Sequence, residues 1–155
     1  MKYTAESRVS RLRVILRFGV LMSLLSLPVL ATPSVQPSSQ IQVARRFLLA
    51  VLGGEFPAAY ALLAPEVSRA ITPQRFREAA LPLYEQGQRH GSTIDLYKLG
   101  YRISDNNTTR SFVAFMFRSD TLAKLPKVQL DVTFRDSTAR QVLSFGLVPA
   151  PQRQK

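Results

Sequence analysis

Few side chains in this sequence could act as a catalytic base. The 155 residues contain no cysteine and a single histidine, His90. These counts exclude a cysteine nucleophile, a thiolate or histidine-rich metal site and a fold held by disulfides, and we expect no metal and no cofactor. The candidates that remain for a general base are His90 and Asp95, because an imidazole or a carboxylate can accept a proton where the geometry supports it.

Each candidate also has a structural interpretation. His90 precedes Gly91 at the expected end of a helix, where an imidazole facing solvent is favoured by the helix dipole. Asp95 falls in an expected strand and is interpreted as an exposed strand residue. Tyrosines could line a ligand cavity, since pockets are largely apolar and aromatic, but their rings also pack in cores while the hydroxyl reaches water. The four tyrosines that we single out are Tyr60, Tyr84, Tyr97 and Tyr101.

The apolar spacing predicts three helices that would position these residues. Over Ile41–Leu52 apolar side chains recur every three to four positions, and Gly53-Gly54 ends the helix. A second helix is expected from Phe56 to Leu63, with a proline in its first turn. The third is expected over Gln74–Gln86, capped by Thr72.

After these helices the apolar period changes from about 3.6 to 2, which predicts an antiparallel meander. A slip of the apolar phase at 97–100 indicates a bulge in the first strand, and the second strand, apolar on both faces over Phe112–Phe117, should be central. If the apolar phase of the third strand faces the helices, Asp131 points away from them. The prediction is an α+β fold, with three amino-terminal helices on one face of a curved four-stranded sheet. The expected strands are Thr93–Ile103, Thr108–Arg118, Pro126–Arg135 and Ala139–Val148.

The amino end has the three-part pattern of a secretory signal peptide. A basic stretch to Arg17 is followed by an uncharged apolar run over Phe18–Val29 and by Ala31. This run is shorter than the roughly 20 apolar residues of a membrane span, so cleavage after Ala31 is favoured over an uncleaved anchor, and no stable membrane span is expected after cleavage. We expect an exported bacterial protein, periplasmic or extracellular, with a signal peptide at 1–31, a flexible lead-in at 32–40, one domain at 41–148 and a flexible tail at 149–155.

The positive charge of the chain separates into two parts. The net charge is +11, and residues 1–31 hold five basic and one acidic side chain, so this leader carries +4 and the rest of the chain +7. The basic residues of the domain are spread over all its expected elements and form no dense run interleaved with aromatics, so no nucleic acid partner is expected. A diffuse positive field suits solubility, or as an alternative the binding of anionic envelope surfaces.

Three short motifs stand at the breaks and starts of the expected helices. They are Gly54-Glu55-Phe56, Ala59-Tyr60-Ala61-Leu62-Leu63-Ala64-Pro65 and Thr72-Pro73-Gln74-Arg75-Phe76. With the long bent strands that follow, they resemble the nuclear-transport-factor-2-like (cystatin-like) superfamily, especially its small secreted bacterial domains of unknown function. The resemblance covers Ile41–Val148 and implies an α+β roll with a conical pocket between sheet and helices.

The resemblance leaves the activity open, because that superfamily contains isomerases, dehydratases, cyclases, transport factors and noncatalytic partners. We expect a noncatalytic module that binds a small apolar ligand or a protein partner in the cavity or on the open face of the sheet. The two-sided apolar strand favours a homodimer through that open face. The alternative that the resemblance implies is a small isomerase- or dehydratase-like enzyme, with Asp95 or His90 as base and a tyrosine as donor.

Overall fold

The computed structural model describes residues 38–103, 107–123 and 125–149. The chain divides into two compact units, Met1–Gln36 and Pro37–Lys155, and every element below belongs to the second. The predicted signal peptide, the first part of the predicted lead-in, and most of the predicted tail lie outside the described residues.

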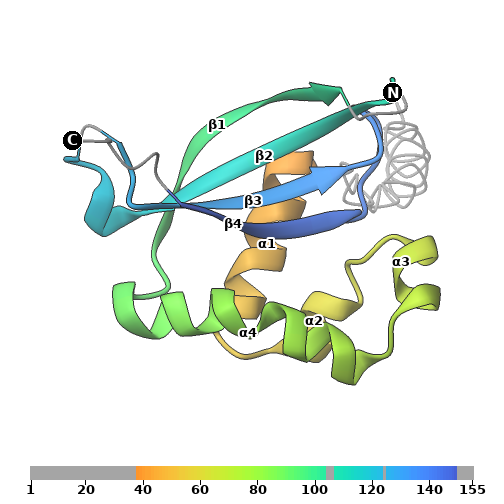
Figure 1. Cartoon of the computed structure of the whole chain (residues 1–155), viewed down its shortest axis with the longest axis horizontal. Coiled ribbons are helices and arrows are strands. Elements are labelled where there is room, and N and C mark those ends of the chain that lie inside the picture. The colour runs from red at the N-terminus through yellow and green to blue at the C-terminus, as the bar shows by residue number, and fades with distance from the viewer. Residues whose placement is uncertain (1–37, 104–106, 124, 150–155) are drawn as a thin grey trace, which may run out of the picture. The chain divides into compact units, whose positions relative to one another are not determined.

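The second unit has the α+β architecture that the sequence predicts, built on a curved antiparallel sheet with the strand order β1-β2-β3-β4. In Figure 1, α1 crosses behind the sheet, and α4 lies below the sheet, on the side of β4. The strands are β1 Ile94–Ile103, β2 Thr109–Phe117, β3 Val128–Phe134 and β4 Ser144–Pro149, with a short 3-10 helix η2 at Arg118–Asp120. The helices are α1 Gln40–Leu52, α2 Phe56–Tyr60, α3 Pro65–Ala70 and α4 Pro73–His90.

The helices differ in number and placement from the three expected on one sheet face. Among the described residues there are four α-helices. Helix α1 packs on β2 and β3, α4 contacts β4, and α2 packs on α1 and α4. The sheet is therefore covered mainly by α1, with α2 and α4 forming a further layer. The likeness to the roll described above stays a prediction.

Helix α1 begins inside the predicted lead-in because Ser39 caps it. The Ser39 hydroxyl accepts from the Gln42 N–H, while the Gln42 side chain accepts from the Ser39 N–H, a reciprocal capping box. Gln40, the first helical residue, donates from its side-chain amide to the carbonyls of Asp136 and Ala139 at 2.7 and 2.8 Å. Residues 39 and 40 are thus part of the folded domain.

Helix α2 is shorter than expected because the chain after it enters a long-range bridge. Leu63 pairs in parallel with Val142. The Val142 N–H donates to the Leu62 carbonyl at 2.9 Å, and the Ala64 N–H donates to the Val142 carbonyl at 2.8 Å. The short helix α3, which the sequence did not predict, follows this bridge and has a proline at its start.

The same bridge delays the fourth strand, which begins at Ser144 rather than Ala139. Val142 is held by the segment after α2, and the turn before it is ordered by Asp136. The Asp136 carboxylate accepts from the Thr138 hydroxyl and from the N–H groups of Thr138 and Ala139, at 2.6 to 2.9 Å. These side-chain bonds order the turn at 136–139, immediately before the expected start of the strand, and the bridge at Val142 then postpones that start to Ser144.

The sheet confirms the predicted bulge and the central strand. The register between β1 and β2 shifts between Leu96 and Lys98, which leaves Tyr97 as the extra residue. Strand β2 lies between β1 and β3. Asp131 is on the face opposite to the buried Leu130 and Val132, as expected for a strand whose apolar phase faces the helices.

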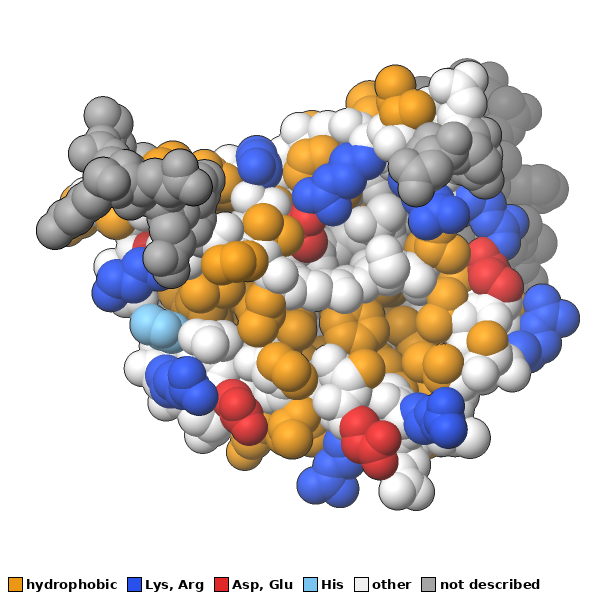
Figure 2. All heavy atoms as spheres, in the orientation of Figure 1, with side chains coloured by type: hydrophobic (Ala, Val, Ile, Leu, Met, Phe, Trp, Pro, Cys, Tyr) orange, Lys and Arg blue, Asp and Glu red, His pale blue; other side chains and the backbone are white. Residues whose placement is uncertain are grey.

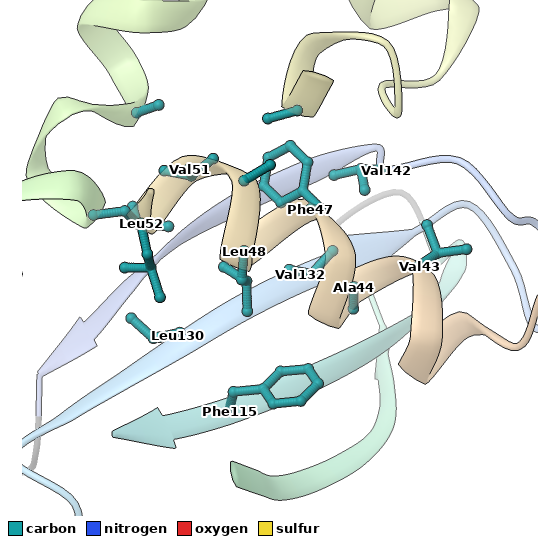
Figure 3. Close-up of a cluster of buried hydrophobic side chains, with 14 of the residues drawn as sticks. Val43, Ala44, Phe47, Leu48, Val51, Leu52, Phe115, Leu130, Val132 and Val142 are labelled. Carbon is teal, nitrogen blue, oxygen red and sulfur yellow. The ribbon is translucent and has the colours of Figure 1, made fainter. Parts of the chain in front are cut away.

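Helix α1 carries the centre of the hydrophobic core. In Figure 3, Leu48 points toward β3, where Leu130 and Val132 lie, while Phe47 points to the other side of the helix. Phe47 packs against Phe145 of β4 and Phe76 of α4, with ring centroids 5.0 and 6.1 Å apart. Because side chains on both sides of α1 are buried, this helix joins the sheet to the outer helices.

Two neighbouring leucines of α1 give a matched test of this packing. Leu48 is fully buried, whereas Leu49 is 40% exposed. We expect Leu48→Ala to lower the free energy of unfolding by about 2–5 kcal/mol, through lost burial and a cavity, and Leu49→Ala to cost less than about 1 kcal/mol. Urea unfolding followed by circular dichroism measures both, and equal costs would contradict the placement of α1.

Candidate ligand-binding groove

A large surface groove lies between α2 and α4. Its volume is about 1110 Å³. We call it the α2–α4 groove and define it by Phe56, Tyr60, Arg77, Glu78, Leu81 and Tyr84, which line it. Two of the four tyrosines singled out from the sequence, Tyr60 and Tyr84, therefore meet at one site.

One face of α4 and the start of α2 form the two walls. Arg77, Leu81 and Tyr84 are spaced by four and three residues, so they lie on the same side of α4. Their wall faces the ring of Phe56, whose centroid is 5.8 Å from that of Tyr84. The groove is thus bordered by two aromatic rings and by Leu81, which is 43% exposed.

Gly54 allows the connection between α1 and α2 to pass beside Tyr84. Its φ is +79°, in the region that L side chains rarely adopt, and a Cβ there would lie 3.2 Å from the Tyr84 ring. The tight turn sets α2 directly against α4. The Gly54-Glu55-Phe56 motif therefore has a clear structural role at one end of the groove.

Tyr60 contributes its ring to the groove and uses its hydroxyl for the fold. The hydroxyl lies 2.7 Å from the Ser68 carbonyl and 2.8 Å from the Ile71 carbonyl, both at the end of the α3 segment. The ring packs edge-on against Phe76, with centroids 5.5 Å apart. Because its hydroxyl is engaged, Tyr60 offers a ligand an aromatic surface.

The rim of the groove carries charge of both signs. The Arg77 guanidinium lies over the Phe56 ring, 5.4 Å from its centroid. Glu78 accepts a hydrogen bond of 3.3 Å from the side-chain amide of Gln74. An apolar floor beside an arginine suits a molecule with an apolar body and an anionic end.

The candidate base Asp95 is engaged elsewhere. It lies across from Met116 on the open face of the sheet, the face away from the helices. Both of its carboxylate oxygens accept from the Arg118 guanidinium, at 3.0 and 3.1 Å. These bonds lower the pKa of Asp95 and raise that of Arg118. Because of the bulge at Tyr97, Asp95 and Tyr101 lie on opposite faces of the sheet.

The other candidate base, His90, is half-buried rather than facing solvent. Its ring stacks on Phe117, with centroids 5.0 Å apart and an interplanar angle of 29°. His90 is the last residue of α4, at the helix end expected before Gly91, and because α4 extends beyond Gln86 this ring lies on the end of β2 and is only partly exposed. Neither His90 nor Asp95 lines any of the three described grooves.

The two remaining tyrosines lie on β1 and do not reach the α2–α4 groove. Tyr97, at the bulge, has the Lys98 ammonium 5.3 Å from its ring centroid. Tyr101 is 65% exposed and lines a smaller groove of about 240 Å³ near the start of α1. The four tyrosines are thus divided between two parts of the molecule.

The open face of the sheet carries an ion pair between a buried carboxylate, Asp131, and an exposed guanidinium, Arg102. Asp131, on the central part of β3, accepts from Arg102 of β1 and from Gln129. The Arg102 guanidinium also covers the Phe112 ring, 4.2 Å from its centroid, and that ring lies against Gly100. Arg102 and Gly100 thus cover part of the Phe112 ring, which is half-buried. Within the described part of the chain, no three His, Asp or Glu side chains are grouped to hold a metal ion.

Sequence reasoning missed the α4 wall of the groove. Arg77 and Leu81 were not singled out, although their spacing from Tyr84 places all three on one helix face. Phe56 was noted only as part of a helix start. The pattern alone did not show that α2 would lie against this face.

Comparisons with protein-family models, with curated proteins and with solved structures gave no match for the chain. The geometry of the groove and the placement of the candidate bases therefore carry the functional argument.

Hydrogen-bonded carboxylates predict the acid sensitivity of the fold. The pKa of Asp136 is lowered by the Thr138 hydroxyl and by the N–H groups of Thr138 and Ala139, and the pKa of Asp95 is lowered by Arg118. Each of these carboxyls has a lower pKa in the folded chain than in the unfolded chain, where its pKa is about 4. Such a group stabilises the fold at pH values above its unfolded-state pKa. The stabilisation is lost as the pH falls through its folded-state pKa.

We therefore expect a thermal midpoint that is level above about pH 5 and falls below about pH 4. Asp136→Asn should lower the midpoint at neutral pH and flatten the acid branch. The control is Glu55→Gln, which neutralises an exposed carboxylate without a recorded side-chain hydrogen bond in the described structure. Scanning calorimetry across this range measures all three proteins, and a midpoint that rises on acidification would contradict the assignment.

Proposed function

We propose that this chain is a noncatalytic binding module whose α2–α4 groove holds a small amphipathic molecule. The observation that carries the proposal is the groove itself, where the Phe56 and Tyr84 rings and the exposed Leu81 stand beside the Arg77 guanidinium. An apolar body would cover the rings and Leu81, and an anionic end would lie near Arg77. Burial of this exposed apolar surface would drive binding.

The positions of the candidate bases support a noncatalytic role over the enzyme alternative. A general base must lie within hydrogen-bond reach of its substrate, beside a cavity. Asp95 is held by Arg118 on the open face, and His90 stacks on Phe117. Neither shares a groove with Tyr60 or Tyr84, so the base-and-tyrosine arrangement of the enzyme alternative gains no support.

Export and membership of the nuclear-transport-factor-2-like superfamily are part of the proposal. They rest on the leader pattern, on the three motifs and on the α+β arrangement. None of the helices in the described part is long and apolar enough to cross a membrane. Figure 2 shows Lys and Arg side chains spread over one face, several along its rim and others in its upper middle, with hydrophobic side chains gathered across the centre. This distribution favours a ligand with an apolar body over a purely electrostatic surface binder.

A fluorescent probe tests the groove. The probe is 8-anilinonaphthalene-1-sulfonate, which joins aromatic rings to a sulfonate and whose emission rises in apolar surroundings. We expect saturable binding that Leu81→Glu weakens by about tenfold or more, because it places a carboxylate on the apolar wall beside the anionic probe. Arg77→Gln should weaken binding and reduce its dependence on salt.

The matched control is Leu122→Glu, the same substitution at a fully exposed leucine in the loop between β2 and β3. Leu122 does not line the groove, so this variant should bind the probe with an affinity within about twofold of the unaltered protein. The change of charge is the same in both variants, so a difference between them reports on the position of the substitution. Near-ultraviolet circular dichroism confirms that each variant is folded. Equal affinities for the Leu81 and Leu122 variants would show that the probe binds elsewhere and would overturn the proposal.

A further inference from the structure

Strand β1 exposes a row of apolar side chains on a single face. Leu96, Leu99, Tyr101 and Ile103 are 38, 61, 65 and 74% exposed, and we call them the β1 stripe. They oppose Phe115, Val113, Ser111 and Thr109 of β2, so all four lie on the helix side of the sheet. Exposure rises along the strand as it runs toward its end. An apolar row of this kind in water indicates a surface that another chain covers.

The apolar row lies on an edge strand of the sheet, where a further strand can be added. β1 is the first strand in the sheet order, so among the described strands it has a partner only on its β2 side. Unpaired edges are commonly protected by charges and by bulges. Here the bulge comes early, at Tyr97, and the charged Lys98 and Arg102 project from the opposite face. The stretch Leu99–Ile103 thus keeps an unpaired edge with an apolar face.

We propose that β1 pairs with β1 of a second copy of this chain, antiparallel and centred on Tyr101. In this register Tyr101 lies across from its own equivalent, and Leu99 lies across from Ile103 of the second copy. Cross-strand partners project from the same face of an antiparallel sheet, so each exposed apolar side chain meets another. The two sheets would join into one continuous sheet, with the helices of both copies on the same side.

Charge selects this register among those that keep the apolar side chains on one face. Centred on Tyr101, the pairing sets Arg102 across from Gly100, and Arg102 is already neutralised by Asp131. A shift that centres the pairing on Gly100 would set Lys98 directly across from Arg102, and like charges directly opposite destabilise a strand pair. The apolar segment is therefore self-complementary in one register, which is the requirement of a two-fold symmetric interface.

The absence of cysteine from the sequence makes a direct test clean. In the proposed register the two copies of residue 101 lie about 4.5–5.5 Å apart between Cα atoms, which a disulfide can span. Tyr101→Cys in the full chain should form a covalent dimer under mild oxidation with copper phenanthroline. Leu99→Cys alone should not, because its two copies are offset by four residues, or about 13 Å along the strand.

Mixing Leu99→Cys with Ile103→Cys should restore cross-linking, since these positions oppose each other between copies. Non-reducing gel electrophoresis reads all these outcomes. If Leu99→Cys cross-links alone as readily as Tyr101→Cys, the contact has no fixed register and the proposal is wrong. A failure of both Tyr101→Cys and the mixed pair to cross-link would overturn it as well.

Multi-angle light scattering on the cysteine-free protein gives an independent test. We expect a concentration-dependent dimer whose dissociation constant rises by about tenfold or more in Ile103→Glu, because the substitution removes two symmetry-related apolar pairs. Leu122→Glu, with the same charge change at another exposed residue, should leave the dimer intact. A monomer at every concentration, or a dimer that Ile103→Glu leaves unchanged, would exclude this interface. Association of β1 with an unrelated extended peptide only, with no self-association, would also overturn the proposal.

Discussion

The burial of α1 between the sheet and the outer helices is the constraint on which the rest of the structure depends. Phe47 and Leu48 are adjacent in sequence, yet both are fully buried, because Phe47 packs between β4 and α4 while Leu48 points toward β3 on the other side of the helix. A helix with both sides covered needs a second layer, and α2 and α4 provide it. Gly87 shows how close this layer lies, since a Cβ there would be 2.9 Å from the Leu52 side chain.

This layering determines where a ligand could bind. The sheet side of α1 is filled by core side chains, among them Leu48, Leu130 and Val132, and neither Asp95 nor His90 lines a described groove. The space lies one layer further out, between α2 and α4, where Gly54 brings Phe56 against Tyr84. The candidate base Asp95 instead joins β1 to Arg118, directly after β2. Asp131, which was not a candidate base, joins β3 to Arg102 of β1.

The sequence predicted what depends on local pattern. The change of apolar period after Gly91 located the sheet, the phase slip located the bulge at Tyr97, and the two-sided apolar strand identified the centre of the sheet. The sequence-based prediction was wrong where segments far apart in the chain form hydrogen bonds with each other. The bridge between Leu63 and Val142 shortens α2 and delays β4, and nothing near either residue indicates it. Likewise Tyr60 and Tyr84 were found by type, but their meeting depends on how two helices pack.

Backbone amide chemical-shift mapping of the isotope-labelled full chain, titrated with decanoate, tests the central claim most directly. Decanoate has an apolar tail and one carboxylate, which match the apolar side chains and the Arg77 guanidinium of the α2–α4 groove proposed as the binding site. The account predicts shifts concentrated in residues 53–60 and 73–84, with the largest near Arg77 and Tyr84. Shifts concentrated instead around Asp95 and His90, or on the open face near Asp131, would contradict it.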